Sequence, residues 1–291
     1  KVDDIKRNQW IVSPESAPTR QIVAIGTTTG VYCYDLNTWE EIIFLEIGEV
    51  REIAFSYGEK ELLVNGGIWD TTSWVLISTY SNMSVFSVSP VENLVAYYYP
   101  SQLGFSSVED GKLMPPEVLI DVHQPTNIVF SFDGTLIAAH DENNTLSVWQ
   151  VSTGNNVLVL NKFSRTIDAI HFLSNQAIIV FSKGKYGATG ENAEVSVWDI
   201  ASGDLLGIYS EDQLFVTASS SGYQFILDSE DETYTPVDGE EDSYTTTSER
   251  NTAIVTLANG ELVKTALNDL EGVCNAAFSP DGSEIAVAAN E

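Results

Sequence analysis

Short apolar runs, and short runs in which apolar and polar residues alternate, cover most of the chain, and turn residues separate them. Residues 136–139 and 285–288 are apolar runs, and the alternating phrase recurs at 147–150 and 196–199. Alternation with a period of two is typical of β-strands, whereas helices repeat about every 3.6 residues. No apolar run approaches the roughly 18 residues that a membrane-spanning helix needs. The pattern therefore predicts an all-β protein built from many short strands.

One turn phrase recurs between pairs of these strands. Residues 278–282 (FSPDG) and 130–134 (FSFDG) each precede a second apolar run, and 55–58 and 86–90 are weaker copies. The Gly closes a tight turn because it adopts positive φ angles without a steric penalty. Each copy therefore predicts a β-hairpin.

A second phrase lies downstream of each hairpin. It reads SVWD at 196–199 and is followed by Ser-Gly at 202–203. Residues 147–150, 31–35 and 68–70 are further copies. The Ser-Gly or Thr-Gly that follows a strand predicts a turn into a fourth, outer strand.

The hairpin followed by a Trp-Asp strand resembles the repeat of WD-repeat proteins. The ends of the equivalent third strands are Asp35, Asp70, Ser107, Gln150, Asp199 and Thr256. Their spacings of 35, 37, 43, 49 and 57 residues bracket the roughly 40–45 of that repeat. The resemblance covers nearly the whole chain and implies a β-propeller of seven blades, each with four antiparallel strands. The chain departs from the family in lacking any Gly-His pair, and blades three and six lack the Trp.

We expect one domain over residues 1–291. The expected blades are residues 8–47, 49–80, 83–120, 124–162, 165–210, 213–267 and, in part, 271–291. The seventh blade has only two strands, and blade one already uses four. Its missing strands would then come from sequence beyond residue 291 or from another chain.

The charge of the chain limits the classes of partner that we expect. Its 42 acidic and 13 basic residues give a net charge of −29. Nucleic-acid affinity depends on Lys and Arg displacing counterions, so nucleic acid and anionic membranes are not expected partners. The acidity favours solubility, a cationic partner or cation binding. With few Lys and many Ser and Thr, the composition favours an extracellular or cell-surface location, and a cytoplasmic one stays open. Asn82 and Asn143 begin glycosylation sequons, which occur often by chance.

No catalytic constellation is evident. His123, His140 and His171 do not show metal-ligand spacing, and a Ser-centred G-x-S-x-G motif is absent. Cys33 and Cys274 fall in a third and a first strand, which lie too far apart for a disulfide. The sequence therefore predicts a protein that is not an enzyme, and a propeller-based hydrolase ranks last.

An acidic insertion at residues 228–250 interrupts blade six. It holds nine acids, of which the metal-ligand candidates are Asp228, Glu230, Asp231, Asp238, Glu240 and Asp242. Several carboxylates together could bind Ca²⁺, although the EF-hand pattern is not met. A solvated, mobile acidic loop and a docking segment are the alternatives. No other cofactor is expected.

A basic insertion at residues 183–190 takes the same hairpin position in blade five. We therefore expect the two insertions to emerge near each other, where loops on a rigid scaffold concentrate binding function. The candidate partner-binding residues are Lys183, Lys185, Tyr186, Tyr234 and Tyr244.

The resemblance to WD-repeat proteins implies a non-catalytic platform that binds other proteins. The alternative is an extracellular structural subunit that assembles with itself. In that case the open last blade would be completed by strands from another chain.

Overall fold

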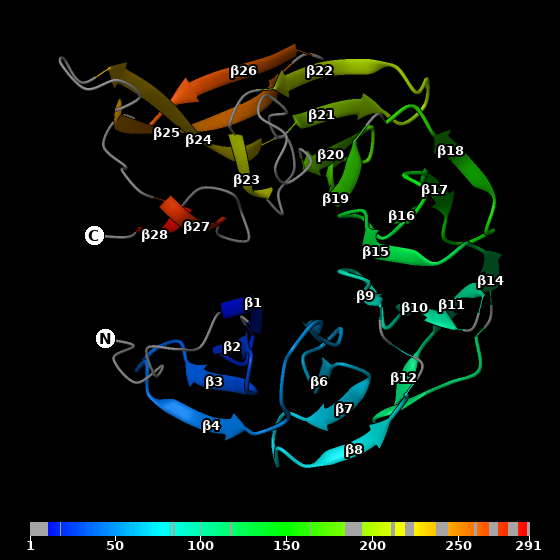
Figure 1. Cartoon of the computed structure of the whole chain (residues 1–291). Helices are drawn as coiled ribbons and strands as arrows, with labels where there is room; N and C mark the ends of the chain where they lie inside the picture. Colours follow the sequence, from blue (N-terminus) through cyan, green and yellow to red (C-terminus); the bar gives the residue numbers. More distant parts are fainter. Residues whose placement is uncertain are drawn as a thin grey trace. The chain divides into compact units, whose positions relative to one another are not determined.

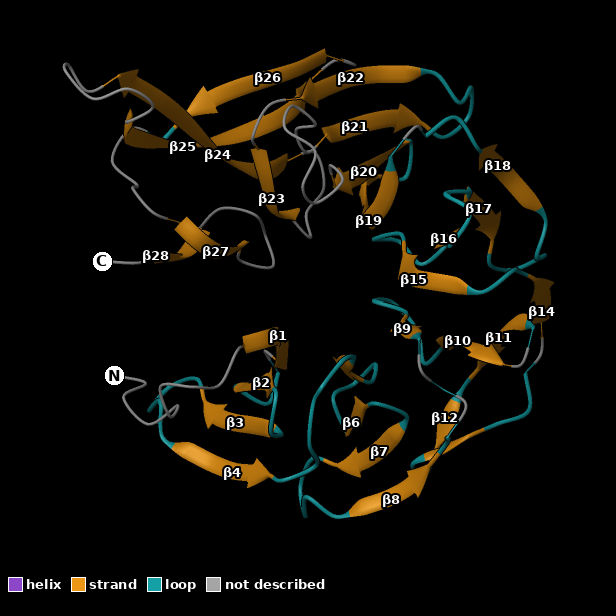
Figure 2. Cartoon of the chain, in the orientation of Figure 1, coloured by secondary structure: helices purple, strands orange, loops and turns teal. Residues whose placement is uncertain are grey.

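Strands joined by turns make up the regular structure of the chain (Figures 1 and 2). The computed structural model describes residues 11–17, 19–81, 83, 85–99, 101–116, 118–163, 165–183, 194–210, 213–218, 224–236, 244–258, 261–267, 273–278 and 285–289. Within these ranges there are strands and no helices, which confirms the all-β prediction. No helix of the described residues has the length and apolar character to cross a membrane.

The chain divides into two compact units. One comprises Lys1–Asp141 with Gln150–Asn155, and the other comprises Glu142–Trp149 with Asn156–Glu291. Each is described below by itself.

The first unit contains three antiparallel sheets of four strands. Their strands are β1 (Ile11–Ala17), β2 (Ile22–Thr27), β3 (Val31–Asp35) and β4 (Glu41–Leu45); β5 (Ile53–Phe55), β6 (Glu61–Val64), β7 (Gly67–Asp70) and β8 (Leu76–Thr79); and β9 (Phe86–Val88), β10 (Val95–Tyr99), β11 (Gln102–Ser106) and β14 (Val118–Asp121). A small extra hairpin, β12 (Val108–Glu109) with β13 (Lys112–Leu113), lies between β11 and β14 in sequence. The unit also holds the hairpin of β15 (Pro125–Phe130) and β16 (Leu136–Asp141).

The second unit repeats the same plan. It contains β17 (Leu146–Gln150) paired with β18 (Asn156–Leu160). Its four-stranded sheets are β19 (Thr166–Ser174), β20 (Ala177–Lys183), β21 (Glu194–Asp199) and β22 (Leu205–Ser210), and β23 (Gln213–Ala218), β24 (Gln224–Pro236), β25 (Tyr244–Ala258) and β26 (Glu261–Ala266). The last two strands are β27 (Val273–Phe278) and β28 (Ile285–Ala289), which pair with each other.

The first strands of successive sheets lie next to one another within each unit. In the first unit β1 neighbours β5, β5 neighbours β9, and β9 neighbours β15. In the second unit β19 neighbours β23, which neighbours β27. Strand order within the sheets follows the chain, as in blades of a propeller.

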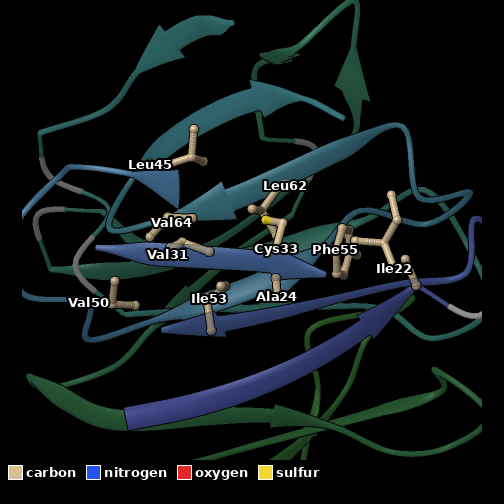
Figure 3. Close-up of a cluster of buried hydrophobic side chains, with 11 residues drawn as sticks. Ile22, Ala24, Val31, Cys33, Leu45, Val50, Ile53, Phe55, Leu62 and Val64 are labelled. Atoms are coloured by element: carbon tan, nitrogen blue, oxygen red, sulfur yellow. The ribbon is translucent and has the colours of Figure 1, made fainter. Parts of the chain in front are cut away.

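Buried apolar side chains of neighbouring sheets form shared clusters. Figure 3 shows one such cluster, in which Cys33 and Ala24 of the first sheet meet Leu62 and Val64 of the second. Cys33 is fully buried and not in a disulfide, and burial raises the pKa of its thiol to about 12. In β2 and β5 buried residues alternate with partly buried ones, whereas consecutive residues of the middle strands, such as Val31 to Tyr34 of β3, are buried on both faces of the sheet. Burial of these apolar side chains away from water produces the core.

Candidate binding surfaces

The Asp of the Trp-Asp phrase has a structural task. Asp70 Oδ1 accepts hydrogen bonds from the Ser73 N–H at 2.6 Å and the Ser73 hydroxyl at 2.7 Å. Asp199 Oδ1 accepts the equivalent pair from Ser202 at 2.7 and 3.0 Å. The hydrogen bonds from Ser73 hold the pKa of Asp70 below its usual value, and those from Ser202 do the same at Asp199. These carboxylates therefore fix the turn into the outer strand.

Two histidines, the buried His140 and the partly buried His171, also lie within the framework. Thr126 Oγ1 lies 2.9 Å from His140 Nδ1, between the paired strands β15 and β16. His171 lies in β19, the first strand of its sheet, and burial lowers its pKa to about 4. It is therefore uncharged at neutral pH.

The structure of the acidic insertion differs from the mobile loop that the sequence suggested. Residues 228–236 and 244–250 form paired strands of β24 and β25, where we considered a mobile loop. Beyond the last partners of β23 and β26, seven pairs from Glu230↔Arg250 to Pro236↔Tyr244 continue as a two-stranded ribbon. The Thr and Tyr residues that fill this segment favour strands, and they extend a pair that the sheet has already formed.

The structure places only part of the predicted metal-ligand set. Asp228, Glu230 and Asp231 lie in β24, opposite Thr252, Arg250 and Glu249. Asp238, Glu240 and Asp242 lie outside the described residues. In the part of the chain that is described, no group of three or more His, Cys, Asp or Glu side chains is arranged to hold a metal ion.

The predicted partner-binding residues are likewise only partly placed. Tyr234 and Tyr244 belong to the same ribbon, where they pair with Thr246 and Pro236. Lys183 ends β20, and Lys185 and Tyr186 lie outside the described residues, so the proximity of the two insertions stays a prediction.

A groove that the sequence did not indicate lies beside β8 in the first unit. Its volume is about 500 Å³. The residues that define this Tyr80 groove are Tyr80, Met83, Tyr97, Leu113, Met114 and Pro115. The hairpin β12–β13 forms one wall, and its only sequence signal is the short Asp110-Gly111 turn within blade three.

Polar contacts clamp this hairpin to β8. The Leu113 N–H donates a hydrogen bond of 2.8 Å to the Tyr80 hydroxyl, and the Ser78 hydroxyl donates one of 2.6 Å to the Gly111 carbonyl. Gly111 has a φ of +70°, and a Cβ there would collide with the side chain of Ile77. The close approach therefore requires glycine, and it fixes the groove wall.

A second groove, of about 490 Å³, lies among three turns of the first unit. The residues that define this Glu92 groove are Val91, Glu92, Leu94, Phe105, Asp133 and Val151. Phe105 and Val151 are buried, whereas 45% of Val91 is exposed. The groove thus combines an apolar floor with an acidic rim.

Comparison with known proteins identifies the fold. No protein-family model matches the chain, and no curated protein is significantly similar to it in sequence. Among solved structures, a chain of a crystal structure of the mitotic checkpoint complex is similar, with a TM-score of 0.67 and 14% identity. The match covers 96% of this chain and 84% of that one. At such identity the likeness speaks for the fold alone, and with the repeated four-stranded sheets it shows the predicted β-propeller.

Proposed function

We propose that this chain is a non-catalytic platform that binds segments of partner proteins. The propeller fold supports this role, since such folds present grooves and loops on a rigid framework. The observation that carries the proposal is the Tyr80 groove, a mainly apolar depression, with Thr79 and Ser81 also in its lining, that has one wall fixed by hydrogen bonds.

The size and lining of this groove suit a short apolar stretch of polypeptide. Its volume of about 500 Å³ falls in the range of roughly 300–1,000 Å³ that is usual for ligand sites. Tyr80 is partly exposed and presents an aromatic surface, whereas Tyr97 is 7% exposed, and the thioether of Met114, 37% exposed, can adapt to different partners. We therefore expect aliphatic or prolyl side chains to fill it.

The clamped hairpin reduces the free-energy cost of binding. A groove wall that is already ordered loses little conformational freedom when a ligand arrives. The bonds from Leu113 to Tyr80 and from Ser78 to Gly111 supply this order before any partner is bound.

The test is a selection of random 12-residue peptides, displayed on phage, against the purified chain. Peptides rich in aliphatic or prolyl residues should be enriched. Their affinity should fall about tenfold or more in Met114→Glu, because the ligand would then bury a charge without a partner.

Ile42→Glu is the matched control. Ile42 lies on β4, is 41% exposed and does not line the Tyr80 groove. It should leave binding unchanged. A selection that enriches no peptide, or peptides that are equally sensitive to both variants, would contradict the proposal.

A second candidate function is self-assembly, in which strands of a second copy of the chain pair with the edge of a sheet. Among the described residues, β28 pairs on one side only, with β27, so its other edge lacks a strand partner there. Unpaired strand edges are templates for a strand from another chain. We propose that a second copy of the chain completes this two-stranded sheet.

A further inference from the structure

We infer that the Glu92 groove binds a basic segment of a partner protein, with a Lys or Arg side chain next to an apolar one. The inference rests on the proposed platform function and adds a second surface to it, with a chemistry that the Tyr80 groove does not share.

Three turns line this groove: those around Glu92 and Gly134 and the turn at the end of β17, which contributes Gln150, Val151 and Ser152. Val91 and Glu92 lie in the turn after β9, and Gly134 lies in the turn between β15 and β16. Gly134 has a φ of +69°, and a Cβ there would collide with the Val91 side chain and lie 3.1 Å from Ser89 Oγ. These first two turns therefore approach as closely as a glycine allows, which fixes the spacing between them.

The floor of the groove is apolar and belongs to the packed core. Phe105 is 1% exposed and meets Phe130 edge-on, with 6.4 Å between the ring centroids. Val151 is held beside it by a hydrogen bond of 3.0 Å from its N–H to the Thr135 carbonyl. An apolar side chain of a ligand would contact the partly exposed Leu94 and Val118 above this floor and the exposed flank of Val91.

The charged residues that line the groove, within the described part of the chain, are both acidic. They are Glu92 and Asp133. Asp133 Oδ1 accepts hydrogen bonds from the Thr135 hydroxyl at 2.7 Å and from the Ser131 hydroxyl at 2.9 Å. Burial raises the pKa of Asp133, but these bonds and the one from the Thr135 N–H outweigh it and lower the pKa below its usual value. The rim is therefore anionic at neutral pH.

The charge of the whole chain acts in the same direction. At a net charge of −29, the chain attracts cationic segments and repels acidic ones during approach. Within about 8 Å, the Debye length at physiological ionic strength, the carboxylates of the rim dominate over more distant charges. Lys and Arg suit the groove further, because their aliphatic stems can lie along an apolar surface while the head group meets a carboxylate.

The experiment selects random 12-residue peptides on the purified chain, with counterselection against Glu92→Lys. Glu92 is exposed, so the variant should fold, and circular dichroism and thermal unfolding check this. The peptides that survive should carry Lys or Arg beside an apolar residue. Their affinity should fall about tenfold or more in Glu92→Lys, and it should fall as NaCl is raised.

Glu40→Lys is the matched control, because Glu40 is also exposed, lies outside the groove and changes the net charge equally. It should change the affinity by less than about twofold. The inference is overturned if counterselection leaves no peptides, if those peptides lack basic residues, or if both variants weaken them equally. A parallel selection without counterselection separates the two claims: when its peptides all lose affinity in Met114→Glu and keep it in Glu92→Lys, the platform function stands and this inference fails. Both fail if the chain selects no peptide.

Discussion

Glu52 shows how a single residue can be held in an unfavourable state by its surroundings. It directly precedes β5, and burial raises the pKa of its carboxyl to about 7. Its backbone is fixed on both sides, since its N–H donates to Asn65 Oδ1 at 3.3 Å and its carbonyl accepts from the Asn65 N–H at 3.1 Å. The carboxyl is therefore kept where its charged form is poorly solvated.

This residue predicts a pH dependence of stability. The folded protein holds the Glu52 proton more tightly than the unfolded chain, where Glu titrates near 4.5, so the free energy of unfolding should fall as pH rises from about 4.5 to 7. Glu52→Gln should remove this fall and stabilise the protein at pH 8 by about 2 kcal/mol, allowing for partial solvent screening. Urea unfolding at several pH values measures it, with Glu40→Gln as the exposed control. An unchanged pH slope in Glu52→Gln would contradict the prediction.

Residues differ in how far the sequence predicts them. Asp70 and Asp199 could be placed at strand ends because their turns involve only neighbours within a few positions. Glu52, Tyr80 and Met114 gave no such signal. Their burial or groove position depends on contacts between elements that lie well apart in the chain, such as β8 with the β12–β13 hairpin.

At the scale of elements, the two glycines that flank β6 form a matched pair. Gly58 and Gly66 have φ angles of +82° and +83°, so both turns require the left-handed region. Gly58→Ala should lower the free energy of unfolding by about 1–2 kcal/mol through backbone strain alone, since nothing lies within 4 Å of its Cβ position. Gly66→Ala should lower it further, because the new Cβ would collide with the Tyr80 carbonyl oxygen. Chemical denaturation of both variants measures the difference, and equal losses would count against this packing.

Local sequence patterns were sufficient to predict some of the hairpins. Asp-Gly turns and Ser-Gly turns predicted hairpins such as β15–β16 and β21–β22, because turn geometry is a property of a few consecutive residues. The acidic insertion was harder to interpret. Its charge suggested a loop, but its Thr and Tyr content and its position on an existing strand pair favour extension of the ladder.

At the scale of the whole molecule, the edge of β28 that has no strand partner among the described residues bears on assembly. If a second copy completes the β27–β28 sheet, association should increase over about a hundredfold rise in concentration, and thermal stability should increase with it. Analytical ultracentrifugation and thermal unfolding at each concentration would measure this.

A lysine on the edge provides the specific test, since charged side chains commonly prevent edge-to-edge pairing. Ala288→Lys should weaken association, whereas Leu119→Lys on β14, the outer strand of another sheet, should not. If the protein stays monomeric at every concentration, or if both lysine variants weaken association equally, the self-assembly function is excluded.

The ribbon that extends β24 and β25 also bears on how such a chain can change over evolution. Its seven pairs lie beyond the partners of β23 and β26, so adding one residue to each arm would keep every remaining pair in register. Adding a residue to one arm alone would shift the register of the pairs beyond it. Selection can therefore lengthen or shorten the whole ribbon in steps of two residues, one in each strand, without disturbing the sheet. The same rule makes the ribbon a suitable place to graft a foreign epitope onto the protein.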